Sequence, residues 1–262
     1  MDIFLASLVL GAVAGLLAGL FGIGGGLVIV PVLALLFTAH AFPHDAIMLM
    51  AVASSLATII LTAISSVWAH HRLGAVVWSK VWRLTPTIML GAGIGAVMAK
   101  QITTDGLRVI LIAFLCYVGI QMALQIKPKQ RHDVQSGLLD ACVGFLIGSL
   151  SAIVGIGGGT LTVPYLVHGN FEMKQAVAVS SACGFPIAIA GTVSYALLGW
   201  HETHLPEWSL GYVYLPAFFG ISLSSILTAP LGAKLAHRLP AATLKRYFSL
   251  LLFIMAVKLA WQ

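Results

Sequence analysis

Charged side chains are scarce in this sequence. Asp, Glu, Lys and Arg together make up 8% of the residues, whereas 60% are hydrophobic. About a quarter of the residues are charged in an ordinary soluble domain, so a soluble fold of this size could not cover its surface. In lipid no such cover is needed, but the backbone must be paired within helices or closed barrels. Because the apolar runs approach the length of about 20 residues that a spanning helix needs, we predict an all-α integral membrane protein.

A polar domain is also missing, which excludes several functions. The chain has a net charge of +6, but its basic residues punctuate the apolar runs instead of gathering on a polar surface. This pattern is typical of loop charges that set membrane topology, and it does not indicate a nucleic-acid partner. The three cysteines, Cys116, Cys142 and Cys183, lie in apolar stretches and are interpreted as packing residues. No cofactor and no metal site is predicted.

The two halves of the chain repeat the same landmarks. Residues 22–26 read Gly-Ile-Gly-Gly-Gly, and residues 155–159 repeat that run. Ala-Ser-Ser at residues 53–55 likewise has a counterpart in Val-Ser-Ser at residues 179–181. Landmarks that recur in a fixed order indicate a duplicated unit. We predict a first repeat at residues 1–125, a cytoplasmic linker at 126–135 and a second repeat at 136–262.

Each half is predicted to contain an unusual opening element and then three membrane spans. The opening element is an apolar run that meets the glycine run and continues into a shorter apolar run. The later runs approach the length of about 20 residues that a spanning helix needs. The predicted spans are residues 45–67, 84–99, 107–125, 175–199, 209–232 and 244–260, and the opening runs are 3–21 with 27–38 and 137–154 with 160–168.

The distribution of Lys and Arg predicts the path of the opening element. If that element crosses the membrane once, the 14 basic residues divide equally between the two sides. If it enters and returns on the same side, eleven lie inside and three, Lys100, Arg108 and Lys258, lie outside. The positive-inside rule favours the second distribution. We therefore predict glycine-interrupted, re-entrant elements and two inverted repeats, as in many secondary transporters, although residues 3–21 are long enough to span alone.

The glycine runs are the first candidates for a binding site. Glycine costs about 1 kcal/mol relative to alanine within a helix, and non-helical backbone in a membrane must face protein or a cavity. Each run leads into a short apolar helix with a proline near its start, where proline is tolerated. A helix N-terminus offers unpaired N–H groups and a partial positive charge, which suit an anion. The candidate residues are Gly22, Gly24, Gly25, Gly26, Gly155, Gly157, Gly158 and Gly159.

Hydroxyl side chains are the second set of candidates. Within apolar helices they can donate hydrogen bonds to an oxyanion without bringing a charge into the membrane. Thr160 is the weaker candidate, and because Leu27 is its counterpart in the first repeat, the site is not symmetric. The alternative is that the glycines permit close packing and the serines join helices. The hydroxyl candidates are Ser54, Ser55, Thr160, Ser180 and Ser181.

Acidic residues at membrane depth are almost absent. Asp140 lies about one turn inside its apolar run, and no buried Asp or Glu suggests itself as a proton relay. Ionisable residues within spans usually mark transport pathways, so their scarcity matters. The sequence therefore supports anion binding better than it supports a coupling mechanism.

The sequence around both glycine runs has a recognisable form. Residues 15–26 read Gly-Leu-Leu-Ala-Gly-Leu-Phe-Gly-Ile-Gly-Gly-Gly, and residues 148–159 read Gly-Ser-Leu-Ser-Ala-Ile-Val-Gly-Ile-Gly-Gly-Gly. Val-Pro follows each run, at residues 30–31 and 163–164. In these motifs, and in length and doubling, the chain resembles the sulfite exporter TauE/SafE family. The resemblance implies a multi-pass permease of the bacterial inner membrane for small sulfur-containing anions, usually working as an exporter.

Several functional hypotheses are compatible with these features. The leading one is a secondary transporter of sulfite, thiosulfate or an organosulfonate that works by alternating access around a midplane site. A permease for another small anion, such as a carboxylate, is the first alternative. A membrane-embedded enzyme is weaker because nearly all of the nine histidines lie at segment ends, and a non-transporting scaffold is the fourth reading. The expected partners are a small anionic substrate and the lipid bilayer, and a homodimer is left open.

Overall fold

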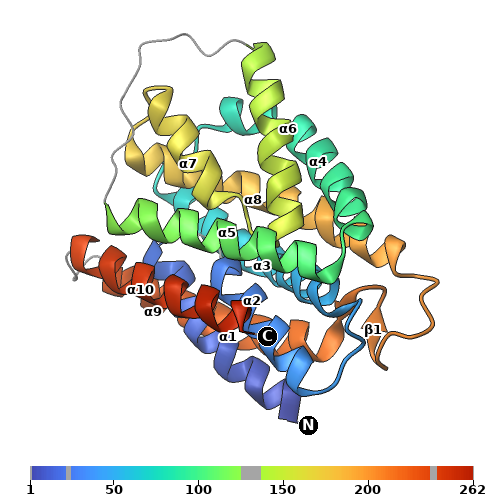
Figure 1. Ribbon diagram of the computed structural model, residues 1–262. Coiled ribbons are helices and arrows are strands. Elements are labelled where there is room, and N and C mark those ends of the chain that lie inside the picture. Colours follow the sequence, from blue (N-terminus) through green and yellow to red (C-terminus); the bar gives the residue numbers. More distant parts are fainter. Residues whose placement is uncertain (1, 22–24, 125–136, 237–240, 262) are drawn as a thin grey trace.

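The computed structural model describes residues 2–21, 25–124, 137–236 and 241–261, and over these residues the chain is almost entirely helical (Figure 1). Short connections join the helices within each half, and a small β-ribbon precedes α9. The elements are α1 (Asp2–Phe21), α2 (Gly26–Ala39), α3 (Ile47–Arg72), α4 (Trp78–Gln101), α5 (Thr104–Ala123), α6 (Gly137–Val154), α7 (Gly159–His168), α8 (Met173–Leu198), β1 (Ser209–Leu210), β2 (Val213–Tyr214), α9 (Leu215–Ala236) and α10 (Ala241–Ala260).

Length and composition make this a membrane fold. Within the described residues, five helices are long and apolar enough to cross a bilayer, namely α3, α4, α5, α6 and α8. Large apolar side chains are exposed on the outer faces of many helices, among them Val9, Leu90, Leu146 and Leu227. Such a surface is stable in hydrocarbon and unstable in water. The prediction of an all-α, multi-pass membrane protein is therefore confirmed.

The helices follow the predicted order with one difference. Each half contains a helix, a glycine-rich turn, a shorter helix and then three further helices. The prediction that one span covers 209–232 was wrong at its start, because residues 209–214 form the β-ribbon and α9 begins at Leu215. Gly211, with a φ of 55°, lies in the turn of the ribbon, and Pro216 follows at the start of α9. Proline is tolerated in the first turn of a helix, where its missing N–H group has no partner to lose. The start of α9 at Leu215 places Pro216 in that turn.

The first helix of each half packs against the fourth helix of the other half. A Cβ atom built on Gly11 of α1 would overlap the backbone carbonyl of Ile221 in α9. The equivalent atom on Gly148 of α6 would overlap the backbone carbonyl of Ile88 in α4. Both glycines thus let two backbones approach closely, as small residues do between membrane helices. The same contact occurs twice, and each occurrence joins one half to the other.

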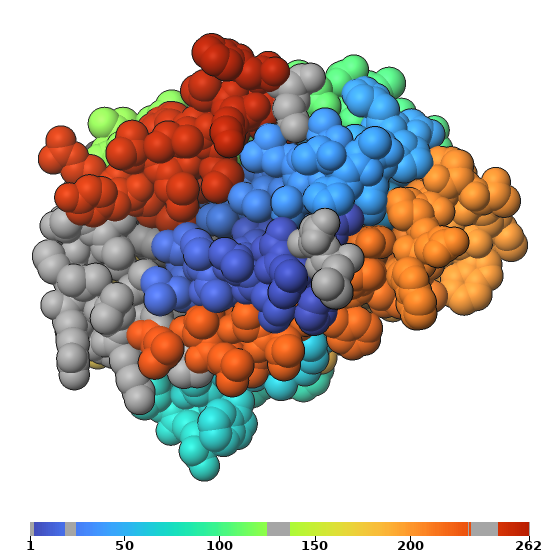
Figure 2. Space-filling model, turned by 90° about the horizontal axis from the view of Figure 1, so that it is seen from below, coloured from blue at the N-terminus to red at the C-terminus, as the bar shows by residue number. Residues whose placement is uncertain are grey.

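The most enclosed helix is α3, which lies at the centre of Figure 1 and has the largest buried share of any candidate span. It packs against α2, α8 and α9, whereas α5 and α10 pack against each other farther out. Figure 2 shows one outer face, on which the N-terminal residues in dark blue lie between the red α10 and orange atoms of α9. Helices of both halves therefore build the core around α3.

Candidate functional site

The glycines that cap α2 and α7 have the same backbone conformation. Gly25 caps α2 with a φ of 77°, and Gly158 caps α7 with a φ of 74°, both in the left-handed region. Side chains disfavour this region, so glycine suits both positions. The first backbone hydrogen bonds of α7 run from the N–H groups of Leu161 and Thr162 to the Gly158 carbonyl. The N–H groups before them point out of the helix end, as they do at any helix start.

The structure brings the two turns into contact. A Cβ atom on Gly26 would lie 2.6 Å from the carbonyl oxygen of Gly155 and 3.0 Å from Cα of Ile156. Ile59 of α3 lies against both turns, with a side-chain atom 3.2 Å from the Cβ position of Gly26 and another 3.2 Å from that of Gly157. The predicted glycines from Gly25 to Gly26 and from Gly155 to Gly159 thus meet beside α3. Gly22 and Gly24 lie outside the described residues.

The candidate serines of the first half already make hydrogen bonds. Both are fully buried on α3. Ser55 Oγ donates to the Gly155 carbonyl at 2.8 Å, and the N–H of Tyr214 donates to Ser54 Oγ at 2.9 Å. Ser55 therefore holds the second glycine turn, and Ser54 holds the β-ribbon. These contacts give both residues a structural role that joins the halves.

The candidate hydroxyls of the second half differ from the serines of the first half in their hydrogen bonding. Within the described part of the chain, the hydroxyl oxygens of Thr160, Ser180 and Ser181 are buried without a hydrogen-bond partner, as are those of Ser151 and Thr162. An unpaired buried hydroxyl costs about 1–3 kcal/mol. With Thr192, six such groups lie on the described residues of α6, α7 and α8, and they are expensive unless a ligand or water pairs with them.

Ser151 and Thr162 lie at the cap of α7. From the Cβ position of Gly158, Thr162 Oγ1 is 3.4 Å away and Ser151 Oγ is 3.5 Å away. Both side chains are fully buried. Ser180 and Ser181 lie one helical turn before Gly184 on α8, and Gly184 touches the backbone of Gly157. The unpaired hydroxyls of Ser151 and Thr162 therefore flank the second turn, and Ser180 and Ser181 lie on the helix whose Gly184 contacts that turn.

Sequence reasoning missed Ser151 and Thr162. The available signal was Thr-Leu-Thr at residues 160–162, which places two hydroxyls in the first turn of a short apolar helix. Ser151 stands four residues before the glycine run, and only the fold shows that it faces the cap of the next helix. The donors at this turn are backbone N–H groups and neutral hydroxyls.

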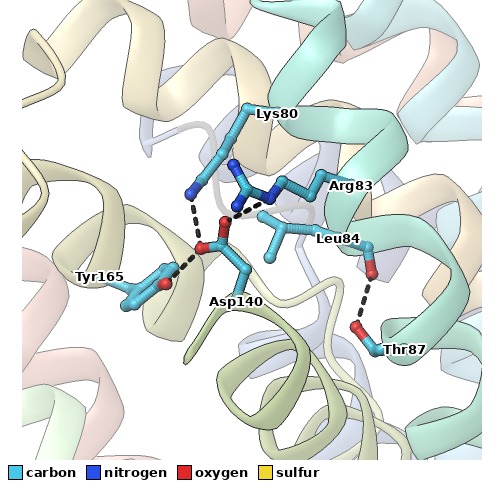
Figure 3. A network of polar contacts seen from close by, with 6 residues as sticks. All are labelled: Lys80, Arg83, Leu84, Thr87, Asp140 and Tyr165. Atoms are coloured by element: carbon cyan, nitrogen blue, oxygen red, sulfur yellow. Dashed lines mark hydrogen bonds and ion pairs between the residues drawn. The ribbon is translucent and has the colours of Figure 1, made fainter. Parts of the chain in front are cut away.

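A buried ionic cluster joins α4, α6 and α7 (Figure 3). Asp140 of α6 is fully buried. Its Oδ1 accepts hydrogen bonds from Lys80 Nζ and from the Tyr165 hydroxyl, each at 2.5 Å, and its Oδ2 lies 3.2 Å from Arg83 Nε. Two cations and a phenol thus hold the one carboxylate that the sequence placed inside an apolar run. The pairing of Asp140 with α4 was not predicted, because nothing in the sequence sets α6 against α4.

A second polar cluster joins the end of α4 to the segment between α8 and α9. Lys100 Nζ donates to the Leu198 carbonyl at 2.9 Å and lies 3.0 Å from Oε1 of Glu202. The hydrogen bond from Lys100 holds the pKa of Glu202 below its usual value. Burial, with Glu202 nearby, raises the pKa of Tyr212 to about 12. Within the described residues, no group of three or more His, Cys, Asp or Glu side chains could hold a metal ion.

The fold and the central turns define a class of protein. Apolar helices cross the bilayer several times, and two halves meet at broken helices deep in the protein, which is the architecture of membrane transporters. The chain belongs to the sulfite exporter TauE/SafE family, whose model matches residues 7–259. The resemblance seen in the sequence is thereby confirmed over nearly the whole chain.

Curated relatives support the same class. A probable membrane transporter protein from Haemophilus influenzae is 41% identical over 256 residues, covering 97% of each chain. A probable membrane transporter protein from Methanocaldococcus jannaschii is 27% identical, covering 95% of this chain and 92% of the relative. YunE from Bacillus subtilis, named as a probable membrane transporter protein, is also 27% identical, covering 99% and 98%. The chain is therefore a membrane transporter by family, and none of these relatives is named for a substrate.

Proposed function

We propose that the chain is a secondary transporter that exports small sulfur-containing anions, such as sulfite, thiosulfate or an organosulfonate, across the bacterial inner membrane. One observation carries the proposal. The buried hydroxyls of Ser151 and Thr162, which have no hydrogen-bond partner, lie at the N-terminus of α7, and the turn before this helix contacts Gly26 of the first half. The family is described as a sulfite exporter family, which supports the choice of sulfur anions and the direction.

The chemistry of the α7 cap suits an oxyanion. A helix N-terminus carries roughly half a positive charge and presents N–H donors. The hydroxyls of Ser151, Thr160 and Thr162 add neutral donors, so an anion can replace its lost hydration without a buried cation. A full charge fixed at membrane depth would be costly, whereas hydroxyls and backbone donors are not. The unpaired donors and the incoming anion therefore satisfy one another.

We further propose that residues 1–125 and 136–262 are inverted repeats joined by a cytoplasmic linker. Four contacts support this. Tyr165, near the end of α7, reaches Asp140, near the start of α6, so the chain returns after the glycine turn. Leu56 of α3 lies against Gly191 of α8, whereas the later Ile59 and the earlier Gly184 both lie against Gly157, a register that fits helices running in opposite directions.

Alternating access follows from such an arrangement. When repeats are inverted, the same rocking of one half against the other opens the site to opposite sides in turn. The proposed site at the α7 cap belongs to the turn in which Gly155 contacts Gly26 of the other half. Movement of one half against the other would therefore change access at the anion itself.

Proteoliposome uptake tests the proposed function. Purified protein is reconstituted, and uptake of radiolabelled sulfite and thiosulfate is measured beside Thr160→Val and Ser180→Ala. Each variant should raise the half-saturating concentration about tenfold, because each loses one buried hydrogen bond to the anion. Ser222→Ala is the matched control, since its hydroxyl is also buried and unpaired but lies on α9.

Three results would contradict the proposal, each in a different part. If the wild type takes up neither anion, and an organosulfonate and a carboxylate are tried with the same outcome, the transport function is wrong. If a carboxylate alone is transported, the sulfur assignment is wrong and the permease for another anion replaces it. If Ser222→Ala weakens uptake as much as Ser180→Ala does, the site at α7 is wrong.

A further inference from the structure

The end of α3 and the start of α4 carry a connected group of aromatic and basic side chains. The Arg72 guanidinium carbon lies over the ring of Trp68, 4.1 Å from its centroid. Trp78 Nε1 of α4 donates a hydrogen bond to His71 Nδ1 at 3.2 Å, and the ring centroids of Trp78 and Trp82 are 6.4 Å apart. Trp68 stands three residues before His71 and four before Arg72, so these three share one side of α3. We call Trp68, His71, Arg72, Trp78 and Trp82 the α3–α4 patch.

The α3–α4 patch lies on the outer surface of the protein, at the depth of lipid headgroups. Trp82 is 68% exposed and Trp68 is 58% exposed. Both α3 and α4 are candidate membrane spans, so their connected ends lie at one interface between hydrocarbon and water. Tryptophan favours this depth because its ring is apolar and its N–H group is polar. The molecules that surround the patch are therefore phospholipids.

Arg72 brings a positive charge to the patch that no acidic side chain offsets. In the part of the chain that the structure describes, no carboxylate forms an ion pair with Arg72. A guanidinium that lies over an aromatic ring can still direct its N–H donors at a phosphate group. Its contact with Trp68 also restricts the side chain, so less conformational entropy is lost when a phosphate binds.

An apolar stripe continues from the patch toward the middle of α3. Ile64, Trp68 and Arg72 follow one another at intervals of four residues and therefore lie on one face of the helix. Ile64 is exposed, and eight residues of helix separate it from Arg72 by about 12 Å along the axis. From Arg72 to Ile64 this face changes from charged through aromatic to aliphatic. A phospholipid has the same order of parts, with a phosphate, a glycerol backbone and acyl chains.

We propose that the α3–α4 patch binds one anionic phospholipid. Arg72 holds the phosphate, and the glycerol backbone and acyl chains lie against Trp68 and Ile64. Two parallel N–H···O bonds between a guanidinium and a phosphate are short and strong. A headgroup with a net negative charge is preferred, because the ammonium group of a zwitterionic headgroup brings a second cation close to Arg72. The inference does not depend on which anion the chain transports.

Native mass spectrometry of the detergent-solubilised protein measures this binding directly. Phosphatidylglycerol and phosphatidylcholine with the same acyl chains are titrated against the wild type and Arg72→Gln. The variant should bind its first phosphatidylglycerol molecule about tenfold more weakly, because it loses the charge-assisted hydrogen bonds, and should bind phosphatidylcholine as before. Arg246→Gln is the matched control, since it removes the same charge from an exposed arginine of α10.

Two further variants test the geometry of the site. Arg72→Lys keeps the charge but cannot form two parallel bonds, so its affinity for phosphatidylglycerol should lie between those of the wild type and Arg72→Gln. Trp68→Leu removes the ring beneath the guanidinium and should weaken binding about threefold. The double variant Trp68→Leu with Arg72→Gln should bind little more weakly than Arg72→Gln alone, because both changes act on the same lipid.

Three outcomes would overturn the inference. Equal losses in Arg72→Gln and Arg246→Gln would show a diffuse attraction to basic residues instead of a site. Equal affinities of the wild type for phosphatidylglycerol and phosphatidylcholine would remove the preference for a negative headgroup. If soluble glycerol 3-phosphate displaces phosphatidylglycerol at equal concentration, the acyl chains do not contribute and the ligand is a free phosphate ester.

Discussion

At the residue scale, Gly158 is a more constrained position than the other capping glycine, Gly25. Its backbone has a φ of 74°, and an added Cβ atom would lie 2.6 Å from Ile187 Cδ1. Gly25 shares the conformation, but the nearest atom to its Cβ position is the Ala14 carbonyl oxygen at 3.3 Å. The two capping glycines thus have the same backbone strain, but an added Cβ atom has less space at Gly158 than at Gly25.

Replacement by alanine should therefore lower the free energy of unfolding more at Gly158 than at Gly25. Gly158→Ala should lower the free energy of unfolding by about 2 kcal/mol, from left-handed strain and a displaced side chain. Gly25→Ala should cost about 1 kcal/mol, from strain alone. Gly93→Ala is the control, because a helical Cβ there meets Ser194 Oγ at an ordinary 3.6 Å.

Thermal unfolding in detergent measures this ranking. Gly93→Ala should keep or slightly raise the midpoint, since alanine favours a helix. Equal midpoints for Gly158→Ala and Gly93→Ala would show that the left-handed cap is not needed for stability. The glycine positions could be predicted because the glycines are contiguous in the sequence. Ser151 could not, because only the folded interior shows that its side chain lies at the cap of the next helix.

At the element scale, the α6–α7 pair depends on its attachment to α4. The carboxylate of Asp140 joins α6 to Lys80 of α4 and to Tyr165 of α7. Both charged side chains are nearly or fully buried, at 0% and 6% exposed. Removing one partner of a buried pair leaves the other charge without compensation, which costs more than removing both.

A double-mutant comparison follows for this cluster. Asp140→Asn should destabilise the protein by about 3–5 kcal/mol, and Lys80→Met by a similar amount. Asp140→Leu combined with Lys80→Met should recover part of the loss, because neither charge is then stranded. Limited proteolysis and thermal midpoints of the folded detergent-solubilised variants provide the measurement. Additive losses in the double variant would show that the two side chains do not act as a pair.

The extents of the helices were largely predictable, and their partners were not. The apolar runs 137–154 and 160–168 became α6 and α7 within one residue, because the length of an apolar run sets the length of a helix in lipid. The two-residue strands at 209–214 carry too short a pattern to be seen in sequence. Which helix packs beside α6 depends on how well the side-chain surfaces of the two helices fit each other. The sequence pattern of a single helix does not show this fit.

At the scale of the whole molecule, the proposed inverted repeats make opposite predictions for one loop. With the loop between α3 and α4 inside, a re-entrant opening element places Thr203 outside, and a single crossing places it inside. Leu73 and Thr203 are both exposed. They therefore offer labelling positions on the two loops.

Cysteine labelling decides between these topologies. In a chain whose Cys116, Cys142 and Cys183 are replaced by alanine, Thr203→Cys should react with a membrane-impermeant maleimide in intact cells. Leu73→Cys should react only after the membrane is permeabilised. Both sites reacting from the same side would contradict the inverted arrangement, and Thr203→Cys protected in intact cells with Leu73→Cys would support a single crossing.

The pairing of α1 with α9 also affects how the chain is made. Its glycine face, which includes Gly11, is covered by residues such as Ser224 that belong to the last quarter of the chain. A ribosome completes α1 long before α9 emerges, so the first helix to enter the bilayer waits without its partner while seven others are inserted. Biogenesis of this protein therefore ends with the first helix finding its place, and a chain truncated before α9 leaves that helix open to the membrane's quality-control proteases.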